Sequence, residues 1–278
     1  MQSARNFYGY STNYVMGSSA ARKQLILRSP GDEAIFDKKG LSFTWKWVVV
    51  FSLLLVGTGC SYLPLGDLTL QGVKVTDHRD YIEMTPVQGL IHPVGLMFWP
   101  GGLVDPQAYR PSLGVFAARG YRVVIAKVPA NLAIVSLNKG LDLADRLGGS
   151  WVAAGHSLGG TAAAWTIFDH PSAFKALVLM AAYPADSTSL ATWNGPVLSL
   201  AAENDGLATQ STLLEKRPLL PPEGVGSGQT RFRVINGGNH AQFGSYGAQD
   251  KDGTATISPQ QQWELMADEL KSFWDGLP

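Results

Sequence analysis

This chain of 278 residues has only one cysteine and no surplus of either charge. Its single cysteine excludes a disulfide within the chain and any metal site built from several cysteines. Lys and Arg together number 22, and Asp and Glu also number 22, so the formal net charge is zero. Because no basic surplus is present to hold phosphates, nucleic acid is not an expected partner. The sequence shows no internal repeat, and its length suits one α/β domain with a short extra segment.

The most informative motif is Gly155-His156-Ser157-Leu158-Gly159, which follows an apolar stretch over 151–154. This order predicts a buried strand, a sharp turn that carries Ser157, and a helix over 158–168. Glycines on both sides of the turn allow the strand and the helix to approach closely. The first turn of that helix would direct backbone N–H groups and a positive dipole end at the space above Ser157. A negative oxygen forms there during acyl transfer.

Three other predicted strands end in loops with glycine and polar residues. They are Val94–Trp99 before Pro100-Gly101-Gly102-Leu103, Val197–Ala202 before Glu203-Asn204-Asp205-Gly206, and Arg231–Ile235 before Gly237-Gly238-Asn239-His240. Strands and helices alternate along the chain, which predicts an α/β fold with a doubly wound, mostly parallel sheet and no large lid domain. One of the helices is expected to run from Asn131 to Leu147, and another to begin with a capping box at Ser258.

Together these motifs resemble the α/β-hydrolase superfamily, and within it the compact, lidless serine hydrolases related to dienelactone-hydrolase-like proteins. The resemblance extends from about Leu68 to the C-terminus and is carried by Phe98–Pro106, Gly155–Gly160, Glu203–Gly206 and Gly237–Gly244. It implies the α/β-hydrolase fold and a serine nucleophile. One departure is Pro100-Gly101, which stands where a His-Gly pair is common before the oxyanion residue.

The chemistry of acyl transfer assigns a role to three of these residues. Ser157 is the predicted nucleophile, and His240 is the predicted general base that activates the weak serine hydroxyl and later acts as an acid. Asp205 is the predicted acid that orients the imidazole and stabilises its charged form. Asp186 is the main competitor for this last role, because it follows the strand after the nucleophile helix.

Backbone N–H groups of Gly102 and Leu158 are the predicted oxyanion donors, with the N–H of Leu103 as a substitute for the first. Apolar side chains on the loops at the same predicted sheet edge are expected to line an acyl or alcohol pocket: Leu103, Tyr183, Trp193, Phe243 and Tyr246. Ordinary packing is the alternative role of each of these side chains.

The N-terminal part differs from the rest of the chain. Residues 1–46 are polar and without periodicity, and we predict that they are disordered or, if translation starts at Leu41, partly untranslated. The segment 47–65 begins with the apolar run Trp47–Val56, with Lys46 directly before it. A basic flank, a short apolar core and small residues together predict a secretory signal.

The small residues of this segment directly precede Cys60, which resembles a bacterial lipoprotein signal with Cys60 as the lipidated residue. An uncleaved membrane anchor over Trp47–Leu65 and a buried core helix are the alternatives. In both membrane interpretations the hydrolase domain, expected over 68–278, lies outside the cytoplasm and is attached to the membrane.

The sequence therefore predicts a membrane-attached, extracytoplasmic serine hydrolase that cleaves small-molecule carboxylic esters through an acyl-enzyme intermediate. Neither a metal nor an organic cofactor is expected. The alternatives are a catalytically silent binding protein on the same fold, and an acyltransferase, thioesterase or amidase that uses the same three residues.

Overall fold

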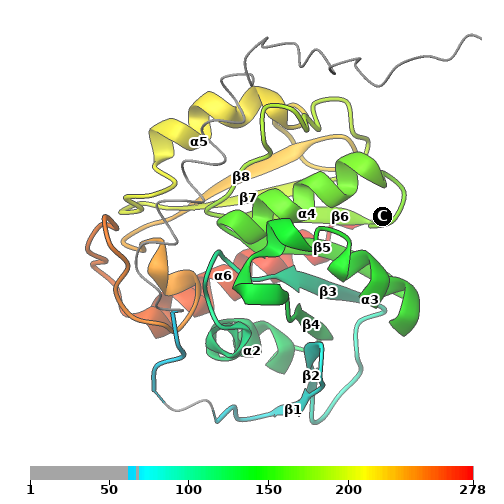
Figure 1. Ribbon diagram of the computed structural model, residues 1–278, viewed down its shortest axis with the longest axis vertical. Coiled ribbons are helices and arrows are strands. Elements are labelled where there is room, and N and C mark those ends of the chain that lie inside the picture. Colours follow the sequence, from blue (N-terminus) through cyan, green and yellow to red (C-terminus); the bar gives the residue numbers. More distant parts are fainter. Residues whose placement is uncertain (1–61, 67–68, 278) are drawn as a thin grey trace, which may run out of the picture. The chain divides into compact units, whose positions relative to one another are not determined.

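The computed structural model describes residues 62–66 and 69–277, and Figure 1 shows how their helices and strands are arranged. One eight-stranded sheet runs in the order β1-β2-β4-β3-β5-β6-β7-β8. Its strands are β1 (Val73–Asp77), β2 (Tyr81–Pro86), β3 (Val94–Trp99), β4 (Val123–Ala126), β5 (Ser150–His156), β6 (Ala176–Met180), β7 (Val197–Ala202) and β8 (Thr230–Ile235). β2 pairs antiparallel with β1 on one side and with β4 on the other. All later pairs in this order, from β4 and β3 to β7 and β8, are parallel. The predicted doubly wound, mostly parallel sheet without a large lid is confirmed.

Helices cover both faces of the sheet. α2 (Arg110–Ala118) and α6 (Pro259–Trp274) pack on one face, and α3 (Lys139–Leu147) and α4 (Leu158–Asp169) pack on the other. α5 (Gln210–Lys216) follows β7. Short 3-10 helices lie in the connections: η1 (Pro106–Tyr109), η2 (Pro129–Asn131), η3 (Ala133–Val135), η4 (Arg217–Leu219) and η5 (Ala241–Phe243). Because helices cover both faces, the central strands are buried on both sides and their sequences are almost continuously apolar.

The predicted helix starts were right at one position and wrong at another. At Ser258 the capping box is present: its side chain accepts the N–H of Gln261, whose side chain accepts the N–H of Ser258. The helix predicted to begin at Asn131 begins instead at Lys139. Ala130 and Asn131 have φ values of 52° and 53°, a left-handed conformation that a right-handed helix cannot continue.

Most of the predicted N-terminal features lie outside the described residues, including the segment 1–46, the apolar run and Cys60. Within residues 62–66 and 69–277, no helix is both long enough and apolar enough to span a bilayer. Residues 62–65 were expected to end the signal or anchor, but they contact loops of the α/β domain: Tyr62 pairs with Val104 in a single parallel bridge. This domain therefore already includes Tyr62, six residues earlier than expected.

Candidate active site

Ser157 occupies a sharp turn between β5 and α4. Its φ is 52° and its ψ is −125°, a conformation that residues with a side chain rarely adopt. The neighbouring glycines make this turn possible. A Cβ on Gly155 would lie 2.4 Å from the carbonyl carbon of Gly159, and a Cβ on Gly159 would lie 2.2 Å from the carbonyl oxygen of Trp99. The turn therefore presents Ser157, which is partly exposed, at the carboxyl edge of the sheet.

Asp205 and His240 meet in the interior at this edge. Nδ1 of His240 lies 2.8 Å from Oδ2 of Asp205, and the two residues are only 1% and 5% exposed, respectively. The other carboxylate oxygen accepts the N–H groups of Leu207 and Ala208 at 2.8 and 2.7 Å. Because an ionised carboxylate only accepts hydrogen bonds, Nδ1 carries the proton and Nε2 keeps its lone pair. Nε2 is buried and has no hydrogen-bond partner among the described residues.

Asp186, the competing candidate for the acid, lies elsewhere. Its side chain is 63% exposed, and Oδ1 accepts a hydrogen bond from Nζ of Lys216 at 2.8 Å. An exposed carboxylate paired with a lysine is screened by water and makes a weak ion pair. The structure thus brings Asp205, and not Asp186, to the histidine.

A second buried histidine, His156, connects this pair to the serine turn. It directly precedes Ser157, and its ring centroid lies 4.4 Å from that of His240. Burial lowers the pKa of His156 well below its ordinary value, and repulsion from His240, whenever that ring is protonated, lowers it further, so the ring of His156 is neutral. The hydroxyl of Tyr109 accepts the N–H of Gly101 and lies 2.9 Å from Nδ1 of His156. Because burial raises the pKa of Tyr109, this hydroxyl stays protonated, and it donates a hydrogen bond to Nδ1 of His156.

The two predicted oxyanion residues, Gly102 and Leu158, lie next to each other. A Cβ on Gly102 would be 3.0 Å from Cδ2 of Leu158. In the part of the chain that the structure describes, neither backbone N–H has a hydrogen-bond acceptor. The substitute donor is excluded, because the N–H of Leu103 donates to the carbonyl oxygen of Asn131 at 2.7 Å. Two adjacent free N–H groups are the requirement for holding a negative oxygen.

The structure adds Asp252, which the sequence analysis did not single out. Its carboxylate accepts the backbone N–H groups of His240 and Ala241 at 3.2 and 2.8 Å. The same carboxylate accepts the N–H of Gly206 at 3.1 Å. One side chain thereby ties the loop of His240 to the loop of Asp205. No sequence signal marks Asp252, since its partners are backbone groups that any residue type supplies.

Gln262 on α6 was also missed, and it fixes the residue before His240. It is fully buried; Oε1 accepts the N–H of Asn239 at 3.0 Å, and Nε2 donates to the carbonyl oxygen of Asn239 at 2.9 Å. A Cβ on Gly238 would lie 2.5 Å from Oε1 of Gln262. The glycine before Asn239 therefore allows the histidine loop to approach α6 closely.

Four of the predicted pocket residues lie at this edge, with different exposure. Leu103 and Tyr183 are partly exposed, and the carbonyl oxygen of Tyr183 accepts a hydrogen bond from Thr161 in the first turn of α4. Phe243 and Tyr246 are 0% and 5% exposed. The ring of Phe243 packs against His156, with 5.4 Å between the centroids. Phe243 thus supports the buried histidines and does not line an open pocket, which corrects the prediction.

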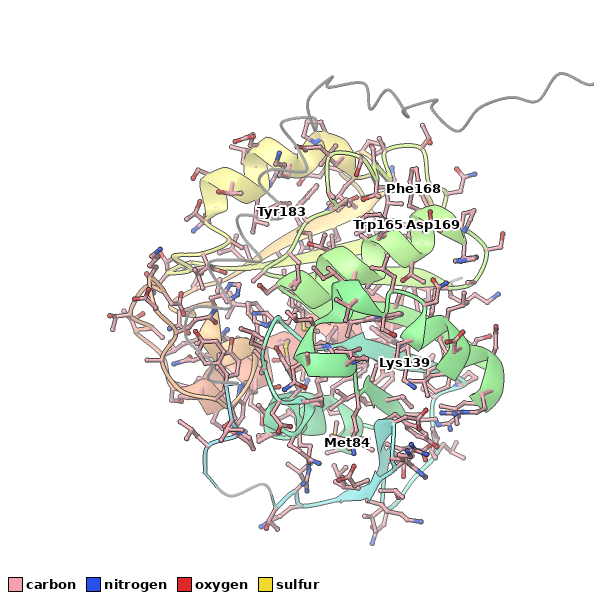
Figure 2. The ribbon with its side chains drawn as sticks, viewed as in Figure 1. Met84, Lys139, Trp165, Phe168, Asp169 and Tyr183 are labelled. Carbon is pink, nitrogen blue, oxygen red and sulfur yellow. The ribbon has the colours of Figure 1, made fainter. Side chains whose placement is uncertain are left out.

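Trp193 does not lie at the carboxyl edge at all. Its Nε1 donates to the carbonyl oxygen of Pro171, which follows the end of α4. This helix has 12 residues and is therefore about 18 Å long. Figure 2 shows its two ends, with Tyr183 toward the start and Phe168 at the far end. The prediction failed because the loop after β6 crosses the face of the sheet to reach the amino end of β7, which runs parallel to β6.

A hollow of about 460 Å³ lies beside Trp193. Its lining residues come from the end of α4 and from the loop before β7, and they include Phe168, Pro171 and Leu190. The hollow is therefore at the opposite edge of the sheet from Ser157 and forms no part of this site.

Backbone strain concentrates around the carboxyl edge. Among the described residues, six residues other than glycine have positive φ: Leu103, Ala130, Asn131, Ser157, Ala181 and Lys251. The first five follow β3, β4, β5 or β6, and Lys251 adjoins Asp252. Such strain clusters where a site holds groups in fixed positions. No group of three His, Cys, Asp or Glu residues suited to a metal ion occurs in 62–66 or 69–277.

Comparison with known proteins identifies the family and the fold of this chain. The model of the alpha/beta hydrolase family matches residues 95–264. Carboxylesterase CesB (YbfK) from Bacillus subtilis is 12% identical with a TM-score of 0.51, over 84% of this chain and 98% of its own. The hydrolase MGS-MChE2, from a sediment metagenome of the Mar Chica lagoon, is 16% identical with a TM-score of 0.50, over 72% and 98%. An alpha/beta hydrolase fold protein from Chitinophaga pinensis is 12% identical with a TM-score of 0.50, over 76% and 99%.

At these identities the solved structures establish the fold alone. No curated protein sequence matches the chain. The family match covers more than half of the chain, and the sheet order, the strained serine turn and the buried His–Asp pair agree with it. This chain belongs to the alpha/beta hydrolase family.

Proposed function

We propose that this protein is a serine hydrolase that cleaves carboxylic esters through an acyl-enzyme intermediate. Ser157 is the nucleophile, His240 is the general base and Asp205 orients the base. The observation that carries the proposal is the state of His240: Nδ1 is bound to a buried carboxylate, and Nε2 is buried without a partner. An imidazole held in this way has one nitrogen free to accept a proton.

In the first step, Nε2 of His240 takes the proton of Ser157 as the serine oxygen attacks the ester carbonyl carbon. The imidazole becomes positively charged, and the carboxylate of Asp205 at 2.8 Å stabilises this charge. Because both groups are almost completely buried, water screens their attraction only weakly. The N–H groups of Leu207 and Ala208 donate to the carboxylate of Asp205 and hold it in place beside the imidazole.

The carbonyl oxygen becomes negative in the same step, and we assign its stabilisation to the N–H groups of Gly102 and Leu158. Leu158 is the first residue of α4, so the positive end of the helix dipole adds to this stabilisation. One such donor is typically worth about 2.7–4 kcal/mol in the transition state.

The protonated His240 then donates its proton to the leaving alcohol, and the acyl group stays on Ser157. Water enters, loses a proton to Nε2 and attacks the acyl carbon; as the acid leaves, Nε2 returns that proton to the serine oxygen, which restores the serine and the neutral imidazole. We favour esters over other acyl substrates because the carboxylesterase from Bacillus subtilis shares the fold.

Replacement of the nucleophile tests the proposal. Ser157→Ala should abolish turnover of p-nitrophenyl acetate and labelling by a fluorophosphonate, while the circular dichroism spectrum and the melting temperature stay close to those of the wild type. Ser172→Ala, at an exposed position beyond the end of α4, is the matched control and should keep full activity. Unchanged turnover in Ser157→Ala would refute the assignment, and turnover that is absent from the wild type as well would favour a silent binding protein.

We also propose that the protein is extracytoplasmic and attached to the membrane. Support comes from the sequence alone: the apolar run Trp47–Val56 after Lys46, and the small residues before Cys60. Cell fractionation of the full chain tests this location. The wild type should sediment with membranes, and Cys60→Ala should lose metabolic labelling with palmitate; recovery of the wild type in the cytoplasmic fraction would contradict the proposal.

A further inference from the structure

Residues 62–66, which we name the N-terminal strap, are fixed to the loop that carries the proposed oxyanion residue. The N–H of Tyr62 donates to the carbonyl oxygen of Leu103 at 2.7 Å. The N–H of Asp105 donates back to the carbonyl oxygen of Tyr62 at 2.9 Å. These two bonds make the single parallel bridge between Tyr62 and Val104. The strap therefore crosses the loop directly beside Gly102.

The strap is fixed a second time, to the loop that follows His240. The N–H of Leu65 donates to the carbonyl oxygen of Ser245 at 2.7 Å, and the Ser245 hydroxyl donates to the carbonyl oxygen of Leu65 at 3.0 Å. The ring of Tyr62 packs on that of Tyr246, with 5.3 Å between the centroids. Figure 1 shows the strap, in blue, beside the orange loop after β8. The strap is therefore bound both to the loop of Gly102 and to the loop that follows His240.

Apolar side chains are exposed along this contact. Leu63 and Leu65 on the strap are 61% and 55% exposed. Val135 is 61% exposed and lies four residues after Asn131, whose carbonyl oxygen accepts the N–H of Leu103. We name Leu63, Leu65 and Val135 the apolar rim. Hydrogen bonds join Tyr62 to Leu103 and Leu103 to Asn131, so the rim residues stand on two segments that both contact the loop of Gly102.

The chain that leads into the strap carries the membrane signal of the sequence. Cys60 lies two residues before Tyr62, and the apolar run Trp47–Val56 ends six residues before it. Two extended residues span at most about 7 Å. A lipid on Cys60 would therefore bring the strap to the membrane surface, and a run that enters the bilayer would hold the strap within about 20 Å of that surface.

We propose that the protein rests on the bilayer through the apolar rim and that its substrates are amphiphilic esters drawn from the lipid phase. This inference rests on the proposed function, since it assigns a substrate class to the same site. An ester that leaves the bilayer beside Leu63 would enter next to the loop of Gly102, to which the strap is bound. The exposed leucine and valine side chains lose contact with water when they enter the interfacial region, which favours this orientation.

Two esters and one double variant test the inference. Full-length protein is reconstituted in phosphatidylcholine vesicles, and the hydrolysis of 4-methylumbelliferyl acetate in water is compared with that of 4-methylumbelliferyl oleate in the bilayer. The variant carries Leu63→Ser and Val135→Ser, which leave the backbone bonds of the strap in place. It should keep the wild-type rate on the acetate and lose about tenfold or more on the oleate, because it removes two apolar contacts with the lipid.

The matched control carries Leu90→Ser and Leu214→Ser, at positions 94% and 61% exposed outside the rim, and it should keep both rates. Equal rates on the oleate in wild type and rim variant would overturn the inference, as would an equal loss in the control variant. A third outcome would also overturn the inference: the wild type sediments as a dimer, while the rim variant is monomeric and keeps its turnover of the oleate. The rim would then be the contact surface for a second copy of the chain. Failure of the proposed function is distinguishable, because the wild type would then hydrolyse neither ester.

Discussion

Two buried histidines stand side by side at the carboxyl edge of the sheet, and their partners differ. His240 and His156 are each 1% exposed, and their ring centroids are 4.4 Å apart. Nδ1 of His240 is bound to the carboxylate of Asp205, whereas Nδ1 of His156 is bound to the hydroxyl of Tyr109. A carboxylate stabilises a protonated imidazole, and a phenol that donates its proton stabilises only the neutral ring. The partner, and not the burial, decides which histidine can act as a base.

The two rings also differ in which parts of the backbone their neighbours hold. On the side of His240, the carboxylate of Asp252 and the amide of Gln262 hold backbone groups of the loop, so the ring is fixed through its own main chain. On the side of His156, the hydroxyl of Tyr109 accepts the N–H of Gly101 and lies 2.9 Å from Nδ1 of the ring. The first arrangement positions a group for proton transfer, and the second positions the loop of Gly102. Changes on the His240 side should therefore lower kcat, and changes on the His156 side should mainly lower stability.

The largest effect is expected from Asp205→Asn. The amide can donate to the imidazole, which favours the wrong tautomer and removes the negative charge, so kcat should fall by about 10⁴-fold. Steady-state kinetics with p-nitrophenyl acetate measure this loss. Asp186→Asn, at an exposed carboxylate, is the control and should keep the wild-type kcat. A small loss in Asp205→Asn would remove the contrast between the two histidines.

Asp252→Asn should give the next largest effect. The amide keeps one acceptor oxygen for the N–H groups of His240, Ala241 and Gly206, and losing charge-assisted bonds of this kind costs about 1.5–3 kcal/mol. If this loss falls on the transition state, kcat decreases by about tenfold to a hundredfold, with KM unchanged.

Two comparisons sharpen the result. Asp250→Asn, at an exposed neighbour, should have no effect on kcat. A change in KM or melting temperature without a change in kcat would show that Asp252 acts only in the fold.

Tyr109→Phe tests the other histidine. It leaves the N–H of Gly101 and Nδ1 of His156 buried without a partner, at a cost of about 1–3 kcal/mol each in the free energy of unfolding. Urea denaturation measures this loss. Tyr121→Phe removes the same atom from a buried ring that stacks on Phe116, and it should cost less. A Tyr109→Phe variant with normal stability but no activity would place the phenol in the chemistry instead.

The smallest effect concerns pH. Burial holds the pKa of His156 below its ordinary value, so this ring stays neutral in the folded state and takes a proton in the unfolded state below about pH 6.5. The unfolded state then binds more protons, and the free energy of unfolding falls as the pH drops below that value, by up to about 1.4 kcal/mol per pH unit.

His156→Gln removes this titration and keeps an acceptor for Tyr109. The variant should lose less stability than the wild type between pH 7 and pH 5, as urea denaturation at both values measures. Parallel pH dependences in the two proteins would contradict the neutral state of His156.

Much of the fold and the core of the site could be predicted from the sequence, because the signals are local. The turn at Ser157 needs glycine at 155 and 159, since the backbones there leave no space for a Cβ. The loops of Gly102, Asp205 and His240 each follow a strand, so parallel topology alone brings them to one edge. Their roles in catalysis stay predictions until the variants are measured.

The remaining parts depend on contacts that the sequence does not reveal. Asp252 and Gln262 bind main-chain atoms of residues distant in the chain, so no residue pattern marks them. Trp193 was misplaced because the loop after β6 changes edge on its way to β7. The helix predicted at Asn131 failed because Ala130 and Asn131 adopt left-handed conformations that serve the contact with Leu103.

The left-handed residues at the carboxyl edge have a practical consequence for attempts to engineer this enzyme. Glycine adopts positive φ without steric cost, whereas each residue with a Cβ lowers the free energy of unfolding by about 1–2 kcal/mol in this conformation. Selection for heat resistance alone would therefore favour glycine at positions such as Leu103 and Ala130, whose φ values are 61° and 52°. Those same changes would loosen the backbone around Gly102, so a screen that scores only survival at high temperature would enrich robust proteins with impaired turnover.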